Sequence, residues 1–187
     1  MMANMVSSTR RASVIALMTA ACVSTNYLLI GVVNVKFMDL IVFVSGVVFG
    51  SLMGASVGVL TWLVYGTLNP YGFSLPILLA TCTGESIYGI IGGMLGSKQI
   101  KNNHETVSDY PWFINVKFAI VGFLLTFVYD LFTNIVSGLV VGIPLLVALI
   151  SGIPFAIVHE ISNTAFFFVG ALPLVRAIGH LFSGGSI

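Results

Sequence analysis

The sequence predicts an all-α membrane protein, a compact bundle of about six transmembrane helices with both termini cytoplasmic. Composition indicates the class, because 58% of the residues are hydrophobic and 7% are charged, whereas soluble domains carry roughly a quarter charged residues. The mean hydropathy is +1.09. The length of 187 residues suits a single integral membrane domain over residues 1–187. We therefore expect a multi-pass protein of the cell membrane.

Apolar runs separated by turn signals predict the first three spans. The first, at residues 12–30, is long enough to cross a bilayer, which takes about 20 residues. Its arginines, apolar run and small residues before Cys22 also resemble a signal sequence. Because the apolar run continues further, we expect a retained helix. The second span, at residues 40–49, meets the third at the glycine-rich bend FGSLMGASVG.

The second half of the chain predicts three longer spans. The loop NPYGFSLP, with two prolines and a glycine, precedes the fourth span at residues 77–95. The polar connection GSKQIKNNHETVSDYPW leads to the fifth span at residues 113–137. GLVVGIP then turns the chain into the sixth span, at residues 145–169, and LPLVRAIGHLF is expected to continue as a cytoplasmic end.

Basic residues predict the orientation, since they concentrate on the cytoplasmic side of membrane proteins. An even number of spans places both termini on one side. Only Lys36 then lies opposite, while the other basic residues share the side of the termini: Arg10, Arg11, Lys98, Lys101, Lys117 and Arg176. The net charge of +1 gives no hint of nucleic acid. Cys22 and Cys82 fall in separate apolar runs, so we expect both thiols to be unpaired.

Three predicted spans carry polar residues on one helical face, because residues four apart share a face. A charged group facing lipid at mid-depth costs about 2.5–3.5 kcal/mol. The stripes are therefore expected to face one another or a water-filled cavity. They consist of Thr81, Glu85 and Tyr88 in the fourth span and of Thr126, Asp130, Asn134 and Ser137 in the fifth. The sixth span has His159, Glu160 and Asn163, of which His159 and Asn163 are four apart.

Depth favours a binding site for these stripes. With the termini inside, Glu85, Asp130 and Asn134 fall toward the outer side, where Tyr65 ends the third span. The outer segment after the first span adds Asn34, Lys36 and Asp39. Hydrogen-bonding groups beside aromatic walls are typical of small-molecule sites. The alternative is that these residues only join helices or anchor them at the interface.

Two enzyme patterns are incomplete. A membrane metalloprotease would need His-Glu-x-x-His, but the sequence HEISN has Asn163 at the second histidine position. No Gly-x-Ser-x-Gly is present. We expect no catalytic residue and no metal site. Two alternatives stay open: a membrane enzyme with Glu85, Asp130 and His159 as acid/base groups, and a standalone carrier coupling protons through Asp130 or Glu160.

Small residues recur at four-residue spacing in two places. Glycines occupy this spacing across the second and third spans, where close helix packing explains most of them. The first span carries Ala12, Ala16 and Ala20 at the same spacing. That alanine stripe serves either as internal packing or as an outward docking face for another membrane protein.

With these features in place, the sequence resembles the substrate-binding S-components of energy-coupling factor (ECF) transporters. The likeness lies in ALMTA, with Ala16 and Ala20, and in VVFGSLMGASVGVLTWLVYG, which is similar to the glycine-rich bend between helices two and three. It continues in the closing stretch from YDLFTNIVSG through GIPFAIVHEISNTAFF. The resemblance covers nearly the whole chain and includes the layout of spans.

The resemblance implies a transport subunit without an activity of its own. Such subunits bind a vitamin or similar micronutrient tightly from outside, and join a transmembrane scaffold protein and two cytoplasmic ATPases. They then topple in the membrane to release the substrate inside. Ala16 and Ala20 would contact the scaffold. No cofactor is expected, since ATP is used by the partner subunits. Members for nickel or cobalt carry a histidine close after the first methionine, whereas this chain begins MMANM, which argues against a metal substrate.

The resemblance places the substrate between the segment after the first helix and helices four to six. Glu85 and Asp130 would accept hydrogen bonds or pair with a cationic group, and Tyr65 and Tyr88 would stack on a ring. Acidic residues outnumber basic ones in this set, which favours a cationic or neutral heterocycle over a polyanion. The expected substrate-binding residues are Asn34, Tyr65, Glu85, Tyr88, Asp130, Asn134, His159, Glu160 and Asn163.

Overall fold

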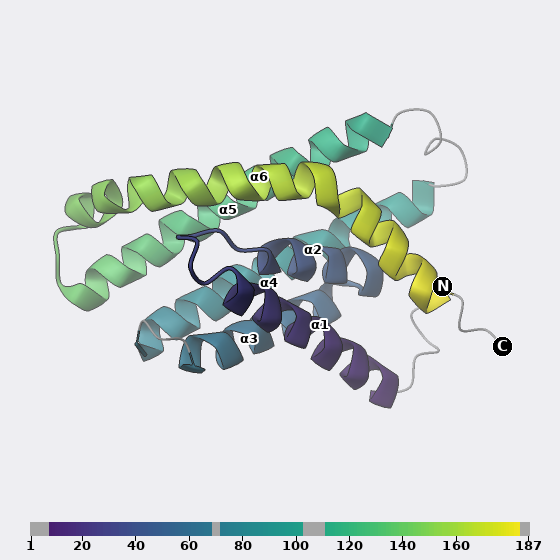
Figure 1. Cartoon of the computed structure of the whole chain (residues 1–187), viewed down its shortest axis with the longest axis horizontal. Helices are drawn as coiled ribbons and strands as arrows, with labels where there is room; N and C mark the ends of the chain where they lie inside the picture. Colours follow the sequence, from purple (N-terminus) through teal and green to yellow (C-terminus); the bar gives the residue numbers. More distant parts are fainter. Residues whose placement is uncertain (1–7, 69–71, 103–110, 184–187) are drawn as a thin grey trace.

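The computed structural model describes residues 8–68, 72–102 and 111–183, and in these ranges the chain forms six helices (Figure 1). Their bounds are α1 Ser8–Leu28, α2 Met38–Phe49, α3 Ser51–Leu68, α4 Leu75–Asn102, α5 Pro111–Val141 and α6 Leu145–Ser183. The prediction of an all-α bundle is confirmed. The long helices extend beyond their predicted spans, most of all α6, which continues through the closing stretch.

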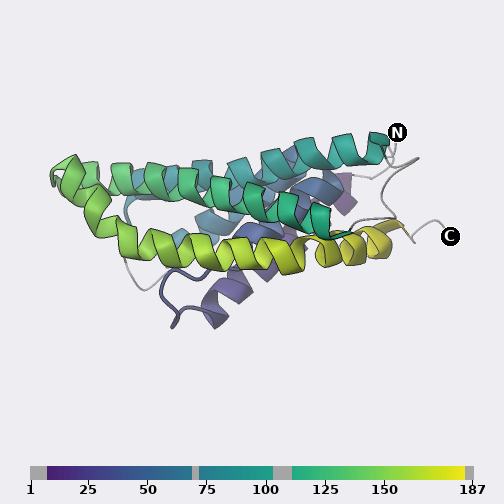
Figure 2. The ribbon, with the colours of Figure 1, turned by 90° about the horizontal axis from the view of Figure 1, so that it is seen from above.

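The short helix α2 is the centre of the bundle. Every residue from Met38 to Val47 is buried, because α2 packs against α1, α3, α4 and α6. Around it, α3 packs on α4, and α5 packs on α6. Figures 1 and 2 show α5 and α6 side by side, with their connected ends, on the left in both views, reaching beyond the other helices. The acidic residue of α2, Asp39, therefore lies in the interior of the bundle, where it contributes to the site.

A glycine seam lets α2, α3 and α4 approach closely. A Cβ at Gly54 would lie 2.6 Å from the Cα of Gly46 and 2.8 Å from that of Gly89. A Cβ at Gly89 would overlap the backbone of Gly54 and Ala55. A Cβ at Gly58 would lie 2.9 Å from the backbone oxygen of Glu85. Small residues at helix interfaces allow this contact between backbones. The seam thereby sets the position of Glu85 relative to α3.

The predicted bend between the second and third spans is present, and α6 contains two prolines that the sequence analysis did not single out. Gly50, with φ 96°, is the single residue between α2 and α3, and this backbone conformation favours glycine. Pro154 and Pro173 lie inside α6, and Figure 1 shows α6 changing direction in its yellow C-terminal part. A proline removes one backbone hydrogen bond and bends a helix.

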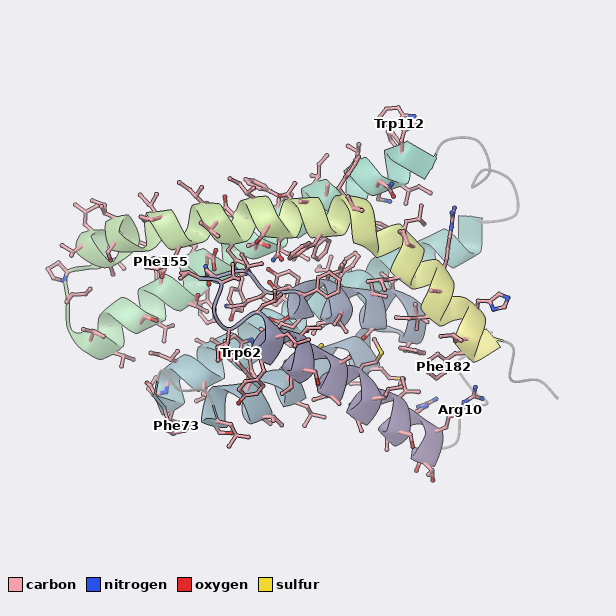
Figure 3. All side chains as sticks on the ribbon, in the orientation of Figure 1. Arg10, Trp62, Phe73, Trp112, Phe155 and Phe182 are labelled. Atoms are coloured by element: carbon pink, nitrogen blue, oxygen red, sulfur yellow. The ribbon has the colours of Figure 1, made fainter. Side chains whose placement is uncertain are left out.

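Residues 29–37 form the loop between α1 and α2, and this loop is tied to α6. Asn34, with φ 55°, donates from Nδ2 to the backbone oxygen of Phe155 at 2.8 Å. Figure 3 shows Phe155 beside the tip of the loop. The contact holds the loop against the N-terminal part of α6.

Four of the described helices are long and apolar enough to cross a membrane: α3, α4 through Ser97, α5 from Trp112 and α6 through Phe182. The prediction of about six spans is thus confirmed in part. α2 is apolar but short, and α1 begins with a polar turn, Ser-Thr-Arg-Arg. Both cysteines are buried and unpaired, as predicted.

The described chain begins and ends at the same end of the bundle. Arg10 on α1 donates to the backbone oxygen of Phe182 on α6 at 3.4 Å, and Figure 3 labels both residues there. An even number of crossings agrees with this arrangement. The cytoplasmic side for these ends stays a prediction, and the side chains of Lys98 and Lys101, which entered that prediction, lie outside the described part.

We expect Gly89→Ala to lower the free energy of unfolding by about 1–3 kcal/mol, because the added methyl group overpacks the seam. Thermal melting of the detergent-purified protein measures the change. Gly179→Ala on α6 is the matched control, since no atom lies within 4 Å of a Cβ at that position. Equal melting temperatures for Gly89→Ala and Gly179→Ala would show that the seam has room for a methyl group at position 89.

Candidate functional site

His159 is the central residue of a buried polar cluster in the middle of the bundle. Its Nε2 lies 2.7 Å from Oδ2 of Asp39 on α2, and its Nδ1 lies 2.9 Å from Oδ1 of Asp130 on α5. The histidine side chain is fully buried. Each of the two N···O contacts requires one proton, on the imidazole or on the carboxyl group. The cluster therefore joins α2, α5 and α6 through two hydrogen-bonded pairs.

Asn163, one turn further along α6, extends the cluster. Its Nδ2 donates to Oδ2 of Asp39 at 2.6 Å and to the hydroxyl of Thr126 at 2.8 Å. Tyr88 on α4 donates from its hydroxyl to the same Thr126 oxygen at 3.0 Å. Thr126 in turn donates to the backbone oxygen of Gly122. These bonds connect α4 to the cluster and fix the amide of Asn163.

Glu85 adds a carboxylate from α4, next to an aromatic group on α3. Nε1 of Trp62 donates to Oε2 of Glu85 at 3.2 Å, and Glu85 is fully buried. The indole ring stacks on Tyr129 with centroids 6.5 Å apart, and Tyr65 meets it edge-on at 5.6 Å. Figure 3 labels Trp62, which lies below the loop after α1 in that view. One side of the cluster is thus an aromatic wall.

Lys36, from the loop after α1, supplies the positive charge. Its Nζ lies 5.2 Å from the ring centroids of both Trp62 and Tyr129. Cations within about 6 Å of an aromatic centroid are attracted by the ring quadrupole. The ammonium therefore sits against the aromatic wall, close to the acidic residues.

Several buried acceptor oxygens of the cluster receive no hydrogen bond from any described residue. Buried polar atoms are nearly always paired, so each such atom requires a reason. Asp130 Oδ2 and Asn163 Oδ1 are unpaired, and Asp39 Oδ1 and Glu85 Oε1 receive no bond from an amide, ring or hydroxyl donor. The Asp39 and Glu85 side chains can share a hydrogen bond with each other when one of them carries a proton. The hydroxyl of Tyr129 is also unpaired. Such a set suits a ligand that donates several hydrogen bonds.

The cluster is closed in this structure. A cavity of about 40 Å³ adjoins Tyr129 between α4 and α5, with lining residues Gly84, Ile87, Leu125, Val128, Tyr129 and Phe132. Ligand pockets usually enclose about 300–1,000 Å³. A molecule the size of a vitamin would therefore have to separate the packed side chains before it could reach the carboxylates.

The structure brings together five of the nine expected substrate-binding residues: Glu85, Tyr88, Asp130, His159 and Asn163. Tyr65 lies at the edge of the same site, in the aromatic wall. Asn34 bonds to α6 and holds the loop. Asn134 packs against Gly152 one turn beyond Asp130, and Glu160 is half-buried beside His159.

The sequence analysis placed Lys36 and Asp39 among the polar groups at the outer side but left both out of the expected substrate-binding residues, and it did not select Trp62 and Tyr129. Asp39 was assigned to the loop segment because the second span was started one residue later. The cost of a carboxylate in an apolar stretch, MDLIVFV, was the signal that would have found it. Trp62 and Tyr129 have no such signal, because aromatic residues are common in membrane helices.

No three His, Cys, Asp or Glu side chains within residues 8–68, 72–97 and 112–182 are arranged to hold a metal ion. The expectations of no metal and no cofactor remain expectations. The alanine stripe is on the surface, since Ala12, Ala16 and Ala20 are all exposed.

We expect His159→Phe to destabilise the protein by about 3–5 kcal/mol, because it leaves Asp39 and Asp130 buried without their shared partner. Unfolding in a titration with dodecyl sulfate measures the effect. His180→Phe, at an exposed position of α6, is the control and should stay near the wild type. A His159→Phe protein as stable as this control would contradict a structural role for the ion pairs.

Comparison with known proteins identifies the family of the chain. A family model described as "ECF-type riboflavin transporter, S component" matches residues 6–180, nearly the whole chain. Searches of curated proteins and of solved structures found no match. Members of the matched family are membrane-embedded transporter subunits and not enzymes. The resemblance seen in the sequence is confirmed, and the chain belongs to the family of S components of ECF-type riboflavin transporters.

Proposed function

We propose that this chain is the high-affinity substrate-binding subunit of an ECF-type importer in the cell membrane. It captures a vitamin or related micronutrient from outside, and delivers it together with a transmembrane scaffold protein and two cytoplasmic ATPases. The observation that carries this proposal is the buried cluster of Asp39, Glu85, Asp130, His159 and Asn163, drawn from α2, α4, α5 and α6. It supports a recognition site because its unpaired oxygens exceed what helix packing requires.

The description of the family supports riboflavin as the first substrate to test. A flavin ring offers flat faces to Trp62, Tyr65 and Tyr129, and its ring nitrogens and sugar hydroxyls suit carboxylate and amide groups. In this proposal Glu85 and Asp130 accept hydrogen bonds from the substrate, and Asn163 accepts or donates them. Tyr88 helps to hold Asn163 in place, because both donate to the hydroxyl of Thr126. Asn134 lies one helical turn after Asp130, and Glu160 directly follows His159. Both would reach the substrate once the helices separate.

Substrate access requires the loop at residues 29–37 to move. The loop carries Lys36 to the aromatic wall and is held to α6 by the bond from Asn34 to Phe155. One side-chain hydrogen bond contributes about 0.5–1.5 kcal/mol. Breaking it is a small cost compared with the binding energy of a tight ligand, so Asn34 serves the site by setting the position of the loop.

The exposed alanines of α1 support the proposed partner contact. Ala16 and Ala20 are both exposed and lie one turn apart, so a partner helix can approach the α1 backbone closely. No residue of the buried cluster comes from α1. ATP is consumed by the partner subunits in this proposal, and this chain needs no cofactor of its own.

A standalone proton-coupled carrier is the second candidate. His159 between Asp39 and Asp130 favours it, because intramembrane His and Asp groups form proton relays in transporters. Uptake that continues without an ATPase partner and follows a proton gradient would support this reading against the first.

Ala16→Trp should abolish substrate uptake while leaving substrate binding intact, because the indole would block the scaffold and does not reach the cluster. Uptake into cells or vesicles containing the partner subunits, and binding to the purified chain, measure the two effects. Ala165→Trp, at an exposed position of α6, is the control and should retain uptake. Equal loss of binding and uptake in Ala16→Trp would show that Ala16 only packs.

Native mass spectrometry of the protein, purified without added ligand, should reveal a bound molecule of vitamin size. The mass should be lost in Asp130→Ala, because that change removes one acceptor and one of the two carboxylate partners of His159. A protein that stays empty after incubation with a panel of vitamins would contradict the proposed function.

A further inference from the structure

The cavity of about 40 Å³ between α4 and α5 lies directly beside the aromatic wall of the site. Of its lining residues, Tyr129 belongs to the site, where its ring meets those of Tyr88 and His159 edge-on, with centroids 6.2 and 6.0 Å apart. Two other lining residues, Val128 and Phe132, are exposed on the surface of α5. The ring of Tyr129 therefore separates the polar cluster from an apolar space that no side chain fills.

Tyr129 differs from the rings around it because its polar atom is not tied to the bundle. Trp62, Tyr88 and His159 each make side-chain hydrogen bonds to carboxylate or hydroxyl groups of the cluster, at distances between 2.7 and 3.2 Å. The buried hydroxyl of Tyr129 has no hydrogen-bond partner among the described residues. Moving Tyr129 therefore breaks no side-chain hydrogen bond, whereas moving any of the other three rings does.

Gly84 on α4 gives the ring of Tyr129 the room that it occupies. A Cβ at this glycine would lie 2.6 Å from Cδ2 and 3.0 Å from Cε2 of Tyr129, whereas non-bonded carbon atoms prefer a separation of about 3.5–4.0 Å. A side chain at position 84 would displace the ring and would also fill part of the cavity, because Gly84 lines it. Both effects would leave the ring less room to move away from Trp62.

Resting on the proposed function, we infer that Gly84 determines the size of the ring system that the site admits. The closed site requires side chains to separate before a substrate enters, and Tyr129 is the ring that moves, along the bare backbone of Gly84. The cavity is too small to hold the substrate, and it receives part of the tyrosine ring instead. Trp62 stays in place, held by its bond to Glu85. Gly84 is then a positioning residue that acts on the substrate through Tyr129.

Binding measurements on the purified full-length chain test this inference. The two probes are riboflavin, a tricyclic flavin, and dimethyl-ribityllumazine, a bicyclic compound with the same ribityl chain. Quenching of the ligands' fluorescence gives both dissociation constants. Gly84→Ala should weaken riboflavin binding by at least about tenfold and lumazine binding by at most about twofold, because the smaller ring system requires less movement of Tyr129.

Gly138→Ala is the matched control for overpacking. Its added methyl group would lie 2.5 Å from Cβ of Ala148, in the contact between α5 and α6. Position 138 is more than two helical turns along α5 from Tyr129. Any loss of affinity in this variant should therefore be equal for the two ligands, and a melting curve of each variant confirms that it is folded.

A double variant separates an effect on Tyr129 from general destabilisation. Tyr129→Leu removes the ring, so adding Gly84→Ala to it should change the riboflavin dissociation constant by less than about twofold. If Gly84→Ala alone does not fold, the double variant should fold again, since the overlap with the ring is gone. Its preference between the two ligands should then equal that of Tyr129→Leu.

Three results would overturn the inference. Unchanged or equally weakened binding of the two ligands in Gly84→Ala shows that the glycine serves packing alone. A full effect of Gly84→Ala in the Tyr129→Leu background shows that Gly84 acts without the ring. Absence of riboflavin binding by the wild type removes the substrate on which the inference rests. The proposed function fails with it only if no vitamin binds and uptake is also independent of the scaffold and ATPase partners.

Discussion

The placement of His159 between two buried aspartates is the interaction on which the rest of the structure depends. Asp39 and Asp130 lie on different helices, and a carboxylate without a partner inside a membrane bundle is costly. The histidine satisfies both with its two ring nitrogens, at 2.7 and 2.9 Å. Because Asn163 binds the same oxygen of Asp39, the geometry of α6 is set by α2. The cluster therefore forms only if α2 places Asp39 next to α6.

That position depends on the glycine seam. α2 is short and buried from Met38 to Val47, so it can lie at the centre only if its neighbours come very close. Gly46, Gly54 and Gly89 provide that approach on α2, α3 and α4. The same seam places Glu85 one turn from Gly89, opposite Trp62. Close packing and the recognition groups are thus produced by one set of helix contacts.

Much of the fold follows from composition and periodicity. The apolar runs and turn signals predicted six helices, the bend at Gly50 and the unpaired cysteines, because each rests on local sequence. The polar stripes also predicted that Glu85, Asp130, His159 and Asn163 would meet, since the cost of exposing them to lipid leaves few other arrangements. Pairwise partners were not predictable, because Asp39 and Asn163 are 124 residues apart. Of the aromatic wall, Tyr65 was predicted, but Trp62 and Tyr129 were missed, because aromatic residues are common in membrane helices until folding brings them together.

The separation of these partners in sequence has a consequence for biosynthesis. Chains are synthesised and inserted from the N-terminus, so Asp39 and Asp130 are synthesised before His159 leaves the ribosome. Until α6 arrives, the early helices carry carboxylates that lack their partner. The nascent intermediate is therefore the most vulnerable form of this protein, and its last helix completes both the charge pairing and the fold.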